Sequence, residues 1–94
     1  MNKDLQRELY ADVLDRLIIH LQNRNDVQNI DLMNLSGFCR NCLSKWYVDA
    51  AEKKNIKIDY EDARKQIYGM HYSEWKEKYQ KEASKEQLKD FNNK

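Results

Sequence analysis

The feature that most constrains this chain is the near absence of the two residues that make tight turns. Among 94 residues there is no proline, and the only glycines are Gly37 and Gly69. Hairpins depend on glycine for backbone conformations with positive φ, and proline fixes the first corner of many turns. A sheet built from hairpins would therefore lack its turn residues. The sequence predicts an all-α protein.

The length limits the chain to one domain, because a single core usually takes roughly 100–150 residues. We therefore treat residues 1–94 as one helical domain, with a polar, frayed C-terminal end at residues 84–94. Hydrophobic residues make up 40% of the chain, which is enough for a folded core. We expect a single small bundle of four to five helices. The first helix and residues 38–54 should form its hydrophobic seam, with two C-terminal helices closing over it.

The charge balance argues against nucleic acid and membrane as partners. The 17 basic and 16 acidic residues give a net charge of +1 and alternate along the chain, so a phosphate-binding basic surface is missing. The longest mainly apolar stretch, residues 13–21, is shorter than the ~20 residues that span a bilayer. Because the N-terminal residues lack the pattern of a signal peptide, we expect a cytoplasmic protein with reduced thiols.

Apolar periodicity predicts the first helices. Residues 4–22 carry a wide apolar stripe at helical spacing, which indicates one helix. Asn25, with Gln28 three residues later, resembles an N-cap with its capping-box partner. Residues 26–54 then form either one long helix or two helices that meet near Ser36.

Capping residues predict the later boundaries. Asn55 can end the central segment in the left-handed conformation. Asp59 is expected to cap a short helix that Gly69 stops, and Ser73 to cap the last helix, which fades into the charged end.

Residues 36–47, SGFCRNCLSKWY, carry Cys39 and Cys42 three positions apart. On a helix this spacing places both thiols on one face, where they could bind a metal or form a redox-active dithiol. A structural zinc site has four ligands, and His20 and His71 are the remaining candidates. They come from different segments and lack the paired spacing of zinc-binding histidines. Zinc is therefore an alternative, and we expect no cofactor.

A third interpretation buries both cysteines in the core, because free cysteine is among the most often buried residue types. If the helix begins near Ser36, the free amides of its first turn and Arg40 would favour the Cys39 thiolate. A thioredoxin-like redox site, however, needs strands that this chain lacks. We favour the core and keep the dithiol as an alternative.

Arg40 and Asn41 lie on the opposite, polar side of that helix. Arginine forms planar bidentate hydrogen bonds, and an asparagine amide both donates and accepts. One use is internal, tying the helix to Asp31, Asp59 or a helix C-terminus. The other use is to bind a partner or a small anion. We favour the internal use and keep the second.

The aromatic residues are biased toward rings with a polar group, with 6 tyrosines and 2 tryptophans against 2 phenylalanines. Tyrosine and tryptophan are enriched in interaction hot spots. Four of them, Tyr68, Tyr72, Trp75 and Tyr79, cluster near the end of the chain. They form either an interaction patch or the boundary of the core, and we weigh the two equally.

DNA binding and catalysis have little support. Residues 26–33 and the helix from Phe38 have the proportions of a helix-turn-helix, but only Arg40 and Lys45 could read a base or a phosphate. The sequence has no Gly-rich phosphate loop, no H-E-x-x-H and no nucleophile elbow, so an enzyme is not indicated.

Two segments resemble the uncharacterised bacterial family known as domain-of-unknown-function family 1244. They are DVQNIDLMNLSGFCRNCLSKWY at residues 26–47 and YEDARKQIYGMHYSEWKEKYQ at residues 60–80. The resemblance implies a small, all-helical, single-domain protein, and it implies no activity, substrate or cofactor. A proline often stands at the position of His71 in the family, which implies that His71 is not an indispensable ligand.

The function that we expect from the sequence is that of a small cytoplasmic interaction or adaptor module. Its partner would be another protein or, in a homodimer, a second copy. The expected binding residues are Arg40, Asn41, Tyr68, Tyr72, Trp75 and Tyr79. The alternatives are a zinc-binding or thiol-redox protein centred on Cys39 and Cys42 and, less favoured, a helix-turn-helix protein.

Overall fold

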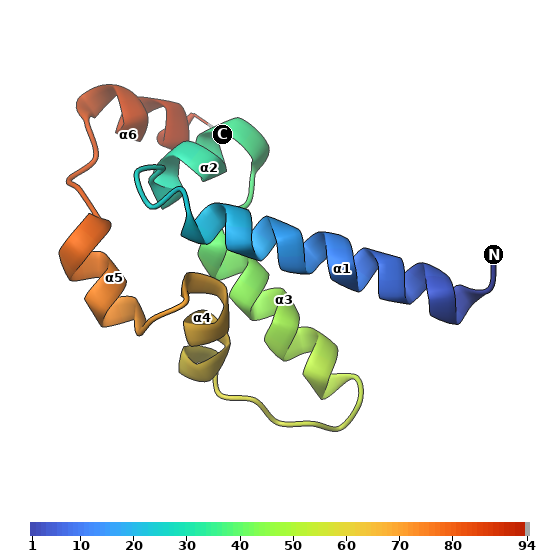
Figure 1. Cartoon of the computed structure of the whole chain (residues 1–94). Helices are drawn as coiled ribbons and strands as arrows, with labels where there is room; N and C mark the ends of the chain where they lie inside the picture. Colours follow the sequence, from blue (N-terminus) through green and yellow to red (C-terminus); the bar gives the residue numbers. More distant parts are fainter. Residues whose placement is uncertain (94) are drawn as a thin grey trace.

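The computed structural model describes residues 1–93, which contain six α-helices and no β-strand (Figure 1). The helices are α1 (Lys3–Gln22), α2 (Asn29–Ser36), α3 (Arg40–Glu52), α4 (Tyr60–Tyr68), α5 (Tyr72–Tyr79) and α6 (Lys85–Asn92). The predicted all-α class is confirmed. No helix among these residues is long and apolar enough to cross a membrane.

The number of helices differs from the predicted four to five for two local reasons. Gly37 adopts a φ of 80° and ends α2, so the central segment forms two helices. The sixth helix, α6, lies in the segment that we expected to fray. Its N-cap is Ser84, which exchanges hydrogen bonds of 2.7 and 3.0 Å with Gln87 in a capping box. These bonds satisfy amides at the start of the helix.

Capping residues set most of the remaining boundaries as predicted. Gly69 ends α4 with a φ of 75°. Asn55 adopts the expected left-handed conformation, with a φ of 62°, but α3 ends earlier, at Glu52, and its C-cap is Lys53. Asp59 caps α4 and accepts a hydrogen bond from the amide of Glu61. The predicted cap of α5 at Ser73 is wrong, because α5 begins at Tyr72.

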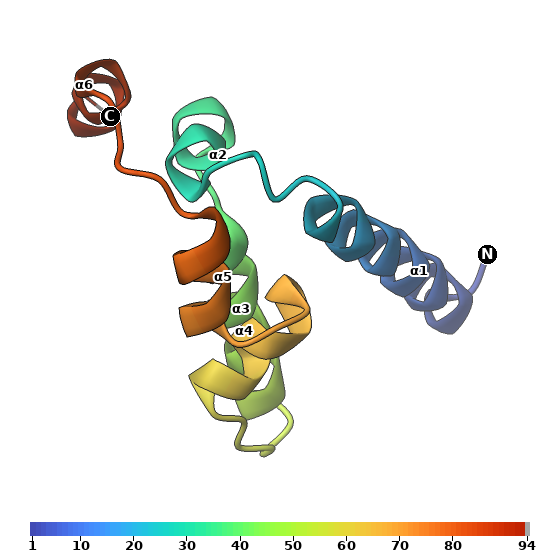
Figure 2. The ribbon, with the colours of Figure 1, turned by 60° about the vertical axis from the view of Figure 1, so that its left-hand side comes forward.

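The core lies where α3, α4, α5 and the last turns of α1 meet. Its buried centre consists of Leu21, Leu43, Ile67, Tyr68 and Trp75. Figures 1 and 2 show α4 beside α3 and α6 beside α2, and α5 packs against α4. A side-chain hydrogen bond of 2.8 Å from Gln87 to Asp31 joins α6 to α2.

Most of α1 projects away from this core. Ile18 and Leu21 in its last turns pack on the core, and the Gln22 amide donates to the carbonyls of Gln66 and Ile67 at 3.2 and 3.1 Å. Figures 1 and 2 show the rest of α1 as an arm that diverges from α3. The predicted hydrophobic seam between the first helix and the central helix is therefore confined to the last turns of α1, where Leu21 joins the cluster that contains Leu43.

Candidate functional site

Arg40, at the first position of α3, is part of the interior. Its side chain is 1% exposed. The guanidinium donates to the carbonyls of Val27 at 2.8 Å, Arg24 at 2.9 Å and Leu21 at 3.5 Å. It also donates to Asn29 Oδ1 at 3.0 Å. The structure thus shows the internal use of Arg40, at the C-terminus of a helix.

The position of Arg40 explains how a charge is tolerated inside. Its acceptors are the carbonyls at and just beyond the end of α1 together with Asn29 Oδ1, and these oxygens carry the partial negative charge that a guanidinium needs. The ring of Trp75 lies 5.0 Å below the guanidinium carbon and adds a cation–π contact. Burial lowers the pKa of the Arg40 guanidinium, yet an arginine remains protonated at neutral pH.

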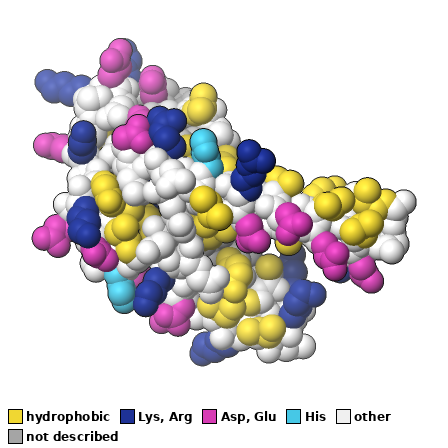
Figure 3. All heavy atoms as spheres, in the orientation of Figure 1, with side chains coloured by type: hydrophobic (Ala, Val, Ile, Leu, Met, Phe, Trp, Pro, Cys, Tyr) yellow, Lys and Arg dark blue, Asp and Glu magenta, His cyan; other side chains and the backbone are white. Residues whose placement is uncertain are grey.

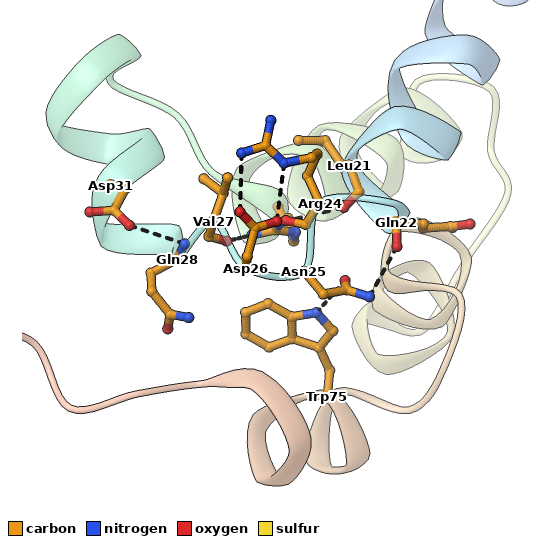
Figure 4. Close-up of polar contacts among 10 residues, drawn as sticks. Leu21, Gln22, Arg24, Asn25, Asp26, Val27, Gln28, Asp31 and Trp75 are labelled. Carbon is orange, nitrogen blue, oxygen red and sulfur yellow. Dashed lines mark hydrogen bonds and ion pairs between the residues drawn. The ribbon is translucent and has the colours of Figure 1, made fainter.

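A side-chain hydrogen bond joins Trp75 to the segment between α1 and α2. Figure 4 shows its indole pointing toward Asn25. The indole N–H donates to Asn25 Oδ1 at 2.9 Å, and the Asn25 amide donates to the carbonyl of Gln22 at 2.9 Å. Because Trp75 is 0% exposed, it cannot contact a partner on the surface of this structure.

Asn41 is the centre of a third polar group. Its Oδ1 accepts from the Tyr68 hydroxyl at 2.7 Å and from Arg64 Nε at 3.2 Å. The guanidinium of Arg64 lies 3.6 Å from the ring centroid of Tyr72. Burial raises the pKa of the Tyr68 hydroxyl, so this hydroxyl stays protonated and keeps donating. The group therefore joins α3, α4 and α5.

The six predicted binding residues are thus brought together, mostly as interior contacts. Three are buried, namely Arg40, Tyr68 and Trp75, and three are half-buried, namely Asn41, Tyr72 and Tyr79. A hollow of about 260 Å³ lies beside them, lined by Asn41, Tyr72 and several further amide side chains. It is smaller than the roughly 300–1,000 Å³ of typical ligand pockets.

The environment of Cys39 does not activate its thiol. Cys39 is the N-cap of α3 and is buried, while Cys42 is half-buried with its sulfur 4.0 Å from that of Met33. Burial raises the pKa of the Cys39 thiol, and backbone hydrogen bonds from Cys42 and Asn41 oppose this effect without cancelling it. Because the thiolate is the reactive form, the hypothesis of a redox dithiol loses its physical basis.

The zinc hypothesis lacks a ligand set. Among residues 1–93 no group of three or more His, Cys, Asp and Glu side chains could hold a metal ion. His20 is exposed on α1, and His71 is exposed just before α5. The helix-turn-helix alternative is not supported either, because Arg40, one of its two candidate readers, is buried.

The structure also exposes apolar side chains of α1 and α3, which the sequence did not indicate as a surface. Val13 is 68% and Trp46 is 55% exposed. Figure 3 shows apolar side chains gathered along the arm of α1 and over the neighbouring part of the body. We call this the α1–α3 surface. It comprises Leu5, Leu9, Tyr10, Val13, Leu14, Trp46, Tyr47 and Ala50.

Two adjoining hollows form a groove between the two helices of the α1–α3 surface. The inner hollow, about 420 Å³, lies against the core and is lined by Leu14, Ile18 and Ile67 among others. The outer hollow, about 610 Å³, lies between α1 and the end of α3. Trp46 and Ala50 line both. The apolar periodicity of residues 4–22 indicated an amphipathic helix, but it did not show that the apolar side is left uncovered.

Comparison with curated proteins finds no match to this sequence. A family model described as a protein of unknown function, DUF1244, matches residues 27–93. The match starts just before α2 and extends through α6, so it contains Arg40, Asn41, Tyr68 and Trp75 but leaves outside α1 and the acceptors at Leu21, Arg24 and Asn25. Because the match covers most of the chain and agrees with the resemblance of its two segments, this protein belongs to the DUF1244 family.

Proposed function

We propose that this chain is a protein interaction module that binds through the α1–α3 surface. The observation that carries the proposal is the amount of apolar surface left uncovered on these two helices, namely the exposed row of α1 and the apolar hollow between α1 and α3. Large contiguous apolar patches are rare on soluble monomers and mark interaction sites. A free arm with such a patch is therefore best explained as one half of an interface.

The composition of the α1–α3 surface supports a protein partner. Trp46, Tyr47 and Tyr10 are of the residue types that contribute most at protein interfaces. Phe38 supports Trp46 from within the chain, with ring centroids 6.0 Å apart, so the indole need not be ordered on binding. An elongated apolar groove accepts the apolar face of a helix, which is a recurring mode of recognition.

The proposal moves the interface away from the residues that the sequence favoured. Arg40, Tyr68 and Trp75 hold the fold together, and their exposure would require unfolding. The free thiols of Cys39 and Cys42 fit a reducing compartment, and we propose the cytoplasm as the site of action.

The test is photo-cross-linking in cells that produce the protein. The photoreactive residue p-benzoylphenylalanine replaces Val13 or Trp46, and in a control it replaces Lys76, which is exposed on α5. We expect covalent protein adducts from positions 13 and 46, identified by peptide mapping, and none from position 76. Adducts that are absent from positions 13 and 46, or equally strong from position 76, would contradict the proposal.

A further inference from the structure

We propose that the partner of the α1–α3 surface is a second copy of this chain. In the resulting dimer, α1 of each copy lies in the groove between α1 and α3 of the other. This inference rests on the proposed function and specifies its partner. Surface area, groove shape and charge each support it independently.

The chain exposes more surface than is expected of a compact monomer of its mass. A folded monomer of 11.4 kDa is expected to expose roughly 5,800 Å². This chain exposes 7402 Å², an excess of about 1,600 Å² over that expectation. A standard interface buries about 800 Å² on each partner. The excess is thus sufficient for a stable dimer.

The shape of the chain locates this excess in α1. The radius of gyration is 15.0 Å, whereas a compact domain of this length has about 12 Å. The longest dimension is 47 Å, against 27 and 24 Å for the other two. Figure 1 shows that the arm of α1 extends the molecule in this direction. A second copy that packs along the arm would make the assembly compact.

The groove matches a helix of the kind that α1 provides. The 20 residues of α1 span about 30 Å. Leu5, Leu9 and Val13 follow one another at intervals of four residues, so they form a narrow apolar row on the exposed part of the arm. This row can enter the groove at Trp46 and Ala50, which line its inner and outer parts.

Charge favours α1 itself as the helix that fills the groove. The outer part of the groove is lined by Arg7, Lys53 and Lys54 against the single acid Asp49. None of these four residues forms an ion pair within residues 1–93. The arm of α1 carries four acidic side chains against the three basic ones Lys3, Arg7 and Arg16, and the acidic ones can face the basic rim. These acidic residues are Asp4, Glu8, Asp12 and Asp15.

Two-fold symmetry makes the arrangement closed. In an isologous interface, each contact from one copy to the other is repeated in reverse. If α1 of the first copy fills the groove of the second, then α1 of the second fills the groove of the first. The two α1 and two α3 helices then form a four-helix contact, with no apolar groove left open to recruit a third copy.

Sedimentation equilibrium of the full chain and its Val13→Glu variant tests the dimer. We expect the wild-type chain to be a dimer. Val13→Glu should raise its Kd at least about a hundredfold, because each dimer would bury two carboxylates in the apolar inner part of the groove, which has no basic side chain among its lining residues. The isolated monomer should tolerate the change, since residue 13 is exposed and glutamate is a good helix former. Far-UV circular dichroism checks that helicity is retained.

The matched control is Leu35→Glu, the same type of change at the end of α2, where the side chain is 86% exposed and lies outside the α1–α3 surface. It should leave the Kd unchanged. A wild-type chain that stays monomeric at its highest soluble concentration would overturn the inference. A dimer that resists Val13→Glu, or dissociates equally with Leu35→Glu, would also overturn it.

A second measurement covers the case in which Val13→Glu fails to fold. Isotopically light and heavy copies, both with p-benzoylphenylalanine at position 13, are mixed and irradiated. We expect cross-links between light and heavy chains that join position 13 to peptides of α1 or α3. Their absence would overturn the dimer. If position 13 then cross-links to another protein in cells, the proposed function stands without self-association, whereas no cross-link in either experiment refutes both proposals.

Discussion

The most informative test of the fold is the replacement of Arg40 by methionine, which keeps an unbranched apolar stem and removes the guanidinium. The change removes the guanidinium donor from the carbonyls of Arg24 and Val27 and from Asn29 Oδ1, although the Arg24 carbonyl keeps its hydrogen bond from the Val27 amide at 3.0 Å. The longer contact to Leu21, at 3.5 Å, adds little.

The magnitude follows from these three bonds. A hydrogen bond to a charged group contributes about 1.5–3 kcal/mol, and a buried acceptor left unpaired costs about 1–3 kcal/mol. Relief of the desolvation that lowers the pKa of Arg40 offsets part of this loss. We therefore expect Arg40→Met to reduce the free energy of unfolding by about 2–4 kcal/mol. A domain of this size has about 5–15 kcal/mol in total.

The assay is urea unfolding followed by far-UV circular dichroism, with every variant at one protein concentration because association would add to the apparent stability. Arg40→Lys keeps the charge but not the planar fork, so it should lose less than Arg40→Met. Lys45→Met on the exposed side of α3 is the control and should change stability by less than about 0.5 kcal/mol. A loss below about 1 kcal/mol for Arg40→Met would refute the proposed anchoring role.

Two further predictions concern the backbone and the thiol. Gly69→Ala should destabilise the domain by more than Gly37→Ala in the same assay. Both glycines have positive φ, but only the new Cβ at position 69 would meet a side chain, that of Gln22 at 3.0 to 3.2 Å; equal losses would contradict this reasoning. Burial raises the pKa of the folded Cys39 thiol, so the unfolded chain releases this proton at lower pH. Stability from this group is therefore complete below the unfolded pKa of about 8.5 and is lost as the pH rises through the folded value. Thermal unfolding from neutral to alkaline pH should show a shallower decline for Cys39→Ala, and an unchanged decline would contradict the prediction.

Features that depend on a few neighbouring residues could be predicted from the sequence. Gly37 and Gly69 adopt positive φ at the end of a helix, as Asn55 does shortly after α3, and the lack of a Cβ or a short polar side chain makes this conformation accessible. Asp59 caps α4 because its carboxylate reaches an amide two residues away. None of these features requires knowledge of the tertiary fold.

Distant contacts changed the local prediction at the start of α2. We expected Asn25 to be the N-cap, with Gln28 as its capping-box partner. Instead, Asn25 binds the indole of Trp75, and Gln28 becomes the N-cap in a capping box with Asp31. The Asn25 side chain thus binds a residue fifty positions away in sequence instead of capping α2.

The candidate site shows the same limit. The sequence could indicate that Arg40 would bind acceptors inside the protein, and a helix C-terminus was among those considered. It could not identify α1 as that helix, since the choice depends on how α1 meets α3. Likewise, an apolar stripe on residues 4–22 predicts that one side of the helix is covered, but the stripe is the same whether its own chain or another copy covers it.

The anchor at Arg40 and the apolar arm of α1 belong to one arrangement. Arg40 donates to the carbonyl of Arg24 just beyond α1 at 2.9 Å and, more weakly, to that of Leu21, and thereby ties the base of the arm to α3. If the arm pairs with a second copy, loss of Arg40 should weaken pairing together with stability, because it releases the base of the arm. Val13→Glu should weaken pairing alone, since Val13 lies on the exposed part of the arm. The DUF1244 match contains Arg40 and leaves α1 outside. The matched part of the chain therefore supplies the residue that ties down the end of α1, and α1 supplies the proposed interface.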